Sequence, residues 1–118
     1  MAIPLNTFKT TTTVLKKGPF IADSDVVYTV PNGITTIVLM AQVANISDDS
    51  AHTVTLSHYN TTTLTRTEAV RNFLVLPNDA AGLITGKMIV EQNNQVRAQS
   101  SKENDLKLIL SYLESLNG

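Results

Sequence analysis

The sequence predicts an all-β protein, a single antiparallel β-sandwich of jelly-roll or immunoglobulin-like type with about seven or eight strands and an extended N-terminal arm. Three observations predict it. Turn-forming residues recur about every 8 to 12 residues. Between them, short runs alternate apolar and polar side chains with a period of two. Threonine, whose branched side chain suits a pleated, half-buried surface, occurs 16 times and often in runs.

The N-terminal segment is expected to be less regular than the remainder. Residues 1–13 are interpreted as an arm or tail, and residues 14–118 as the sandwich domain. For residues 1–9 we expect a loose tail, with an arm laid on a neighbouring subunit as the alternative, since termini are loose unless something ties them down. A first strand is predicted over residues 10–16, ending where Gly18-Pro19 interrupts any ladder.

The segment from residue 26 to residue 45 organises the prediction. Two β-rich runs meet there at Pro31-Asn32-Gly33, whose residues suit a tight turn, so a central hairpin is expected. Residues 35–44 form the longer run and are largely apolar on both sides. A helix over these residues would show no single apolar stripe, so the pattern predicts a central strand.

The middle of the chain continues the strand pattern. Residues 52–60 alternate as a half-buried strand should, and residues 61–65 form a polar tip. Residues 66–76 are a further extended candidate, although residues 68–73 could make one helical turn. Residues 80–86 are expected to be irregular.

The C-terminal third offers two short strands and one ambiguous element. Strands are predicted over residues 87–91 and 95–100, with a hairpin-like turn at residues 92–94. The last element is predicted as a strand from residue 106 through about Leu113, because a lone helix fits the all-β pattern less well. The alternative is a helix that begins at Asn104, since an apolar stripe at helical spacing also exists: Leu106, Ile109, Leu110, Leu113 and Leu116.

Composition excludes several classes of protein. The 118 residues suit one domain, and a net charge of −1 with scattered Lys and Arg gives no footprint for nucleic acid. No apolar run reaches the roughly 20 residues of a membrane span, and the first 13 residues are too polar for a signal peptide. The absence of cysteine excludes disulfides and thiolate chemistry. We therefore expect a soluble protein made in a cytoplasm.

The candidate chemical residues do not combine into a site. His52 and His58 would lie roughly 20 Å apart on one strand, too far to share a metal ion. Ser57 precedes His58 directly, so their side chains point to opposite faces of a strand and cannot form a catalytic pair. Asp48 and Asp49 lack the spacing and glycine of a calcium loop. We predict no enzyme activity, no cofactor and no metal.

A protein interface is the one functional site that the residues suggest. A weakly charged, threonine-rich surface can meet another protein without a large cost of charge desolvation. The candidate interface residues come from the N-terminal arm and from the polar tip with its neighbouring aromatic residue: Phe8, Thr10, Thr11, Thr12, Thr13, Tyr59, Thr61, Thr62 and Thr63.

The order of motifs resembles a family of small β-sandwich virion structural proteins of tailed bacteriophages, particularly those of marine and cyanobacterial phages. The segments that carry the resemblance are residues 30–33, 35–45, 54–59, 73–79, 83–91 and 110–114. The resemblance implies a virion location and multiple copies, in capsid decoration or in tail, neck, baseplate or fibre attachments. It also implies that the partners are the protein itself and other virion proteins.

The alternative hypothesis is a receptor- or carbohydrate-binding module of a tail fibre, with a host surface glycan as its partner. Tyr59 beside the polar tip would then supply the exposed aromatic ring that sugar sites usually need. The sequence holds no tryptophan, so this hypothesis ranks second.

Overall fold

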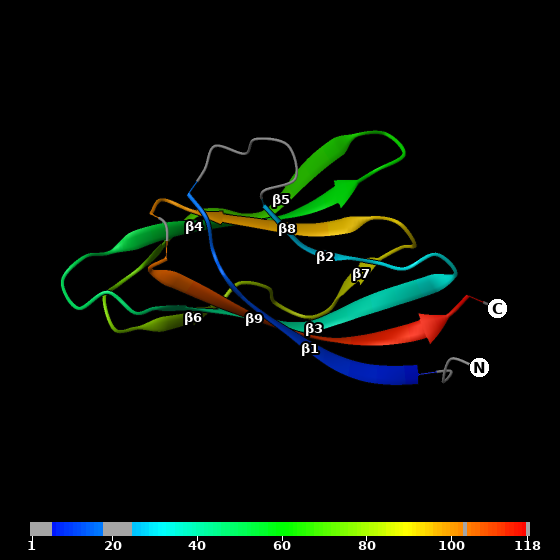
Figure 1. The fold of residues 1–118 in the computed structure, drawn as a ribbon, viewed down its shortest axis with the longest axis horizontal. Helices are drawn as coiled ribbons and strands as arrows, with labels where there is room; N and C mark the ends of the chain where they lie inside the picture. The colour runs from blue at the N-terminus through cyan, green and yellow to red at the C-terminus, as the bar shows by residue number, and fades with distance from the viewer. Residues whose placement is uncertain (1–5, 18–24, 103, 118) are drawn as a thin grey trace.

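The computed structural model describes residues 6–17, 25–102 and 104–117, and these residues form two stacked antiparallel sheets without a helix (Figure 1). The first sheet has the strand order β1-β9-β3-β6, with β7 also paired to β3, and the second has the order β2-β8-β4-β5. The strands are β1 Asn6–Val14, β2 Val26–Thr29, β3 Ile34–Asn45, β4 His52–Asn60, β5 Thr65–Val75, β6 Ala80–Gly82, β7 Met88–Val90, β8 Gln95–Ser100 and β9 Leu106–Leu116.

This strand order is that of a jelly roll. The first and last strands pair with each other, and the chain crosses to the opposite sheet after β1, β2, β3, β5, β7 and β8. An immunoglobulin sandwich instead pairs its first strand with its second. The predicted all-β sandwich is therefore confirmed, and of the two predicted types the jelly roll is the one present.

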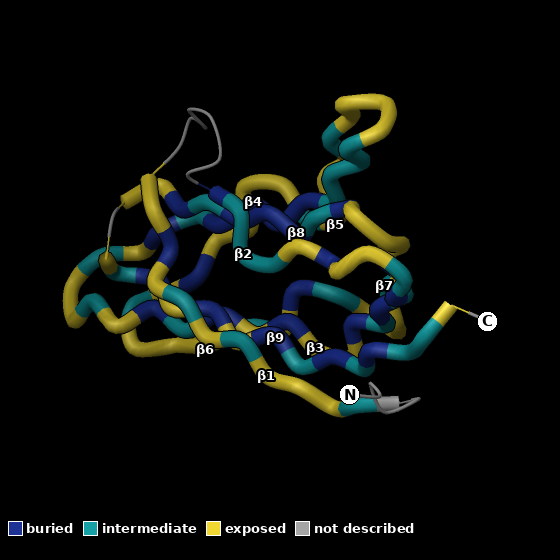
Figure 2. Tube along the Cα trace, turned by 45° about the vertical axis from the view of Figure 1, so that its right-hand side comes forward, coloured by how far each residue is buried: buried dark blue, intermediate teal, exposed yellow. Residues whose placement is uncertain are grey.

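The core lies between the inner faces of the two sheets. β9 shows the alternation most clearly, because Leu106, Leu108 and Leu110 are fully buried while Lys107 and Ile109 face outward. Buried side chains from β3, β4 and β8 belong to the same core cluster as this row. Figure 2 marks the buried residues of these strands in dark blue. At each such position, burial of the apolar side chain stabilises the packing of the two sheets by roughly 1.5–3 kcal/mol.

A bulge in β3 changes which of its residues face the core. The pairing with β9 shifts between Val38 and Met40, so Val38 is buried before the bulge and Ala41 and Val43 after it. β3 pairs with β9 on one side and with β6 and β7 on the other, which confirms the predicted central strand. The outer side of β3 was expected to be buried, but Leu39 and Met40 are each 37% exposed. The reason is that no element in the described ranges covers the outer face of the first sheet.

Two predicted hairpins are wrong. Pro31-Asn32-Gly33 does form a turn, but it joins β2 in the second sheet to β3 in the first. Residues 92–94 likewise join β7 in the first sheet to β8 in the second. The two turns hold each other, since Val30 donates its N–H to the Asn94 carbonyl (3.0 Å) and accepts from the Asn93 N–H (2.9 Å). β4 and β5 form the hairpin whose tip was predicted at residues 61–65.

The first and last strands are both longer than predicted. β1 begins at Asn6 rather than at residue 10, so the described part of the predicted arm or tail is a strand of the sandwich, paired with β9 along its length. Residues 1–5 lie outside the described residues. At the other end, β9 is a strand as predicted and not the alternative helix, and it extends to Leu116 because β1 and β3 pair with it from both sides.

The segments between residues 65 and 86 also differ in detail. The predicted strand over residues 66–76 is β5, and the alternative helical turn is not formed. It carries two register shifts against β4, and Asn72 has the positive φ (50°) that asparagine tolerates. The segment at residues 80–86 is not wholly irregular, because β6 adds three residues to the edge of β3.

A buried carboxylate ties the two sheets together at one end of the sandwich. Glu114 of β9 is 6% exposed, accepts from the Tyr28 hydroxyl of β2, and forms an ion pair with Lys9 of β1 (Oε1–Nζ 2.8 Å). The Tyr28 hydroxyl also bonds Thr36 (2.9 Å), and its ring packs on Tyr112 with centroids 4.3 Å apart. Burial alone would raise the pKa of Glu114, but the hydrogen bonds from Lys9 and Tyr28 outweigh it and hold the pKa below 4.5.

Substituting Glu114→Gln is expected to destabilise the fold by about 1–2 kcal/mol at pH 7, since Lys9 stays half in water and only the charge-assisted bonds are lost. The depressed pKa means that this contribution is present above the ordinary Glu value and is lost as the pH falls through the lower pKa of the folded state. Urea unfolding of both proteins at pH 7 and at about pH 3 measures it. An equal difference at the two pH values would contradict the charge-based explanation.

Candidate assembly surface

The outer face of the first sheet carries a row of apolar side chains that crosses four strands. Phe8 of β1 is paired with Leu113 of β9, Leu113 with Ile37 of β3, and Ile37 with Ile89 of β7. Phe8 is 75% exposed and Ile89 is 62% exposed, so the ends of the row are open to solvent. We call the outward-facing residues of this sheet the exposed face.

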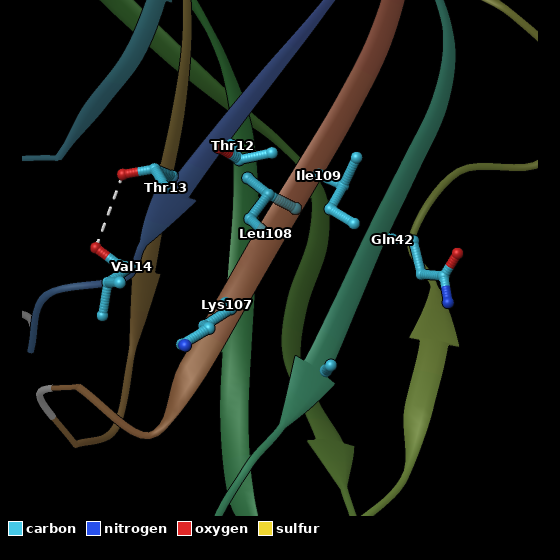
Figure 3. Close-up of a pocket in the computed structure, with 8 residues that line it drawn as sticks. Thr12, Thr13, Val14, Gln42, Lys107, Leu108 and Ile109 are labelled. Atoms are coloured by element: carbon cyan, nitrogen blue, oxygen red, sulfur yellow. Dashed lines mark hydrogen bonds between the residues drawn. The ribbon is translucent and has the colours of Figure 1, made fainter.

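The exposed face is hollowed where β1, β9 and β3 lie side by side. Figure 3 shows Thr12 and Val14 on β1, Leu108 and Ile109 on β9, and Gln42 on β3 around the depression. Its volume is about 640 Å³, and its lining consists of Thr12, Thr13, Val14, Gln42, Ala44, Lys107, Leu108 and Ile109. Its largely aliphatic lining suits an apolar side chain better than a charged ligand.

Charge is nearly absent from this surface. Among the outward-facing strand residues that the structure describes, Lys107 is the one that ionises. Thr10 and Ser111, a cross-strand pair, supply uncharged hydroxyls between the apolar positions. A surface of this composition can be covered by another protein without desolvating many ions.

The outer face of the second sheet is different, because it holds a buried ionic cluster. Asp25, 4% exposed, binds Arg66 (Oδ2–Nη1 2.9 Å) and lies 3.5 Å from Nη1 of Arg97, which is itself 6% exposed. Arg97 also donates to Gln95 (2.9 Å) and lies over the Tyr59 ring, with its guanidinium carbon 3.8 Å from the centroid. These contacts lie within the second sheet and its flanking residue Asp25, and they occupy the charged groups of the cluster.

The structure divides the predicted interface residues between the two sheets. Phe8, Thr10 and Thr12 lie on the exposed face, whereas Thr11 and Thr13 alternate to the other side of β1. Thr11 is engaged there by the Tyr112 hydroxyl, at 2.8 Å. Three of these five predicted positions therefore lie on the exposed face, and their role in an interface stays a prediction.

The other predicted residues lie at the β4–β5 hairpin of the second sheet. One face of the Tyr59 ring is covered by Arg97. Thr61 donates to the Asn93 carbonyl (3.0 Å), and Asn60 accepts from the backbone N–H groups of Thr62 (2.9 Å) and Thr63 (3.1 Å). The tip is thus held by hydrogen bonds within residues 60–63 and to the turn at Asn93. It belongs to the second sheet, whereas β1 belongs to the first.

Sequence reasoning missed the apolar residues that dominate the exposed face, namely Ile37, Ile89, Ile109 and Leu113. The signal was present in the alternation of β9, where the side opposite the buried leucines carries Ile109 and Leu113. A strand that is apolar on both sides in a two-layer protein has one side without a covering layer, and that side is a candidate interface.

His52 and His58 lie at different positions along β4, and one of them is paired with an acid. His52 is buried and its Nε2 lies 2.9 Å from Asp105, while His58 is half-buried farther along β4. In the described ranges, no group of three or more His, Asp or Glu side chains could hold a metal ion. Nor do those ranges include a helix of the length and apolarity needed to cross a membrane.

Comparison with known proteins gives a likeness of fold. No family model and no curated protein matches the chain. Among solved structures, the chain is similar to one from the acid-stable capsid structure of Helicobacter pylori bacteriophage KHP30, with a TM-score of 0.53 and 13% sequence identity. The match covers 98% of this chain and 90% of that one, so the whole jelly roll is shared with a chain of a bacteriophage capsid structure.

Proposed function

We propose that the protein is a non-enzymatic structural component of a bacteriophage virion that assembles in multiple copies with itself and with other virion proteins. The observation that carries the proposal is the exposed face, where an apolar row crosses four strands and Lys107 is the one ionisable residue among the described outward-facing strand positions. Such a surface is an unusual feature of a protein that acts alone. The similarity of the entire fold to a chain of a phage capsid structure supports the same proposal.

Within the virion, we propose capsid decoration rather than attachment at the tail, neck or baseplate. The likeness to a chain of a capsid structure supports this choice. The protein would be made in the host cytoplasm and dock through the exposed face. The marine or cyanophage type suggested by the sequence resemblance remains part of the proposal.

The test is binding to particles that lack the protein. Such particles, purified from a gene-deletion strain, should bind the recombinant chain saturably and at a fixed number of copies, as measured by quantitative mass spectrometry of gradient-purified particles. Ile89→Asp, which places a charge on the exposed face, should weaken binding at least about tenfold.

Leu74→Asp is the matched control for this experiment. Leu74 is also an exposed apolar strand residue (56% against 62% for Ile89), but it belongs to β5 of the second sheet. It should leave binding within about twofold of the parent. No saturable binding of the parent chain, or an equal loss in both variants, would overturn the proposal.

The alternative glycan-binding module has less support. It relied on an exposed ring at Tyr59, and the guanidinium of Arg97 covers one face of that ring at 3.8 Å. No second function is therefore proposed.

A further inference from the structure

The outer edge of β1 is an unprotected strand edge. β1 is nine residues long, pairs with β9 without a register shift, and contains no proline. Its one charged residue, Lys9, forms an ion pair with Glu114 (2.8 Å), so the lysine charge does not prevent another strand from pairing with this edge. Within the described part of the chain, no strand pairs with the other side of β1, which borders the first sheet in Figure 1. Natural sheets usually protect such edges with charges, bulges or proline, because an open edge pairs with other chains.

The register shows which backbone groups are free at this edge. Leu15, just beyond β1, donates its N–H to the Leu106 carbonyl (2.8 Å), and these two residues continue the β1–β9 register. In an antiparallel ladder, hydrogen-bonded and non-hydrogen-bonded pairs alternate. The odd-numbered residues of β1 therefore bond β9, and the N–H and C=O groups of Phe8, Thr10, Thr12 and Val14 point away from it.

We propose that β1 pairs antiparallel with β1 of a second copy of this chain, about a two-fold axis at Thr11, so that two first sheets become one continuous sheet. The free even-numbered residues then form the hydrogen-bonded pairs, and the exposed faces of both copies lie on the same side. The pairs are Phe8 with Val14, Thr10 with Thr12, and Thr11 with Thr11 of the second copy.

Side-chain chemistry selects this register. It places Phe8, 75% exposed, beside Val14 of the second copy, which is 42% exposed and lies at the rim of the aliphatic hollow. Aromatic and β-branched residues are a favourable cross-strand pair. Lys9 falls opposite Thr13, so no like charges meet. A two-fold axis at Lys9 would oppose two ammonium groups, and an axis at Thr10 would leave Phe8 opposite Thr12.

The inference rests on the proposed assembly in multiple copies and names one contact between copies. Its first test is sedimentation equilibrium of the purified chain and its Thr10→Pro variant. Proline removes an N–H that β9 does not use and is tolerated where that N–H faces solvent. The dimer dissociation constant should rise at least about tenfold with the thermal midpoint little changed. Thr11→Pro, which removes a bond to β9, should instead lower the thermal midpoint.

The second test fixes the register by cross-linking. The chain has no cysteine, so one introduced thiol is an unambiguous probe. Thr11→Cys should give a disulfide-linked dimer on mild oxidation, because facing residues of a non-hydrogen-bonded pair have Cα atoms about 4.5 Å apart. Thr13→Cys, on the same side of β1, should not, since its two copies would lie about 14 Å apart along the strands.

The outcomes separate this inference from the proposed function. A purified chain that stays monomeric at high concentration, a dimer that Thr10→Pro leaves unchanged, or equal cross-linking of both cysteine variants would overturn the pairing of β1. Saturable binding to particles could still hold in each of those cases. Conversely, a β1-paired dimer that never enters particles would overturn the virion role and leave the pairing intact.

Discussion

Substituting Asp25→Ala is expected to destabilise the protein by about 3–5 kcal/mol, because it removes one partner of a buried ion pair. The Asp25 side chain is 2% exposed, and it meets the guanidinium groups of Arg66 at 2.9 Å and Arg97 at 3.5 Å. Removing the carboxylate takes away the anion that both guanidinium groups face, and the Arg97 side chain is only 8% exposed. Urea unfolding at pH 7 gives the loss as a shift in midpoint at constant slope.

Two controls identify the cause of this loss. Arg66→Ala removes a partner whose side chain is 21% exposed, and it should cost less than half as much as Asp25→Ala. In the double variant Asp25→Asn/Arg97→Gln both buried charges are gone, so its loss should be smaller than the sum of the single losses. Strict additivity would show that the carboxylate and the guanidinium do not act as a pair.

The strands of this fold could largely be predicted from side-chain alternation. The pattern of β9 is an example, since its buried positions follow each other two residues apart from Leu106 to Glu114. The same stripe also fitted a helix, and the choice of a strand depended on the character of the rest of the chain. The pattern could not show where β1 begins, because β1 is held mainly by its pairing with β9. The two strands are far apart in the sequence: Thr11 and Tyr112, which share a hydrogen bond, are separated by 101 positions.

The partner of each strand could not be predicted from local sequence. Pro31-Asn32-Gly33 specifies a reversal of the chain, but a reversal serves equally well within one sheet or between two. Which occurs is decided by burial: Val30 is 1% exposed and its backbone is held by the turn at Asn93 and Asn94. Such contacts join residues more than 60 positions apart, and no window of sequence contains both.

Local sequence could not show which of the candidate interface residues on β1 face outward. Threonine runs marked Thr10 and Thr12, which do face outward, but composition could not separate them from Thr11 and Thr13 on the other side of the strand. Ile37 and Ile109 looked like core residues because they are apolar. They belong to the outer face of the first sheet, which no element in the described part of the chain covers.

Leu110→Ala is expected to cost about 2–5 kcal/mol in the free energy of unfolding, measured by urea at pH 7. Leu110 is fully buried at the centre of β9, between Thr11 of β1 and Ala41 of β3. Both neighbouring strands are fixed by their own pairing, so they cannot collapse into the space that the shortened side chain leaves.

The adjacent residue provides the matched variant. Ile109 loses a side chain of similar size in Ile109→Ala, but it is 40% exposed on the exposed face, so the cost should stay below about 1 kcal/mol. Binding of Ile109→Ala to particles should nevertheless weaken if the proposed docking through the exposed face is right, because Ile109 lines the hollow on that face. If Ile109→Ala destabilised the isolated protein as much as Leu110→Ala, the side chain of Ile109 would be needed for the stability of the fold. A small loss of stability with a large loss of binding would mean that the outward-facing apolar side chains of β9 contribute to assembly and not to the stability of the fold.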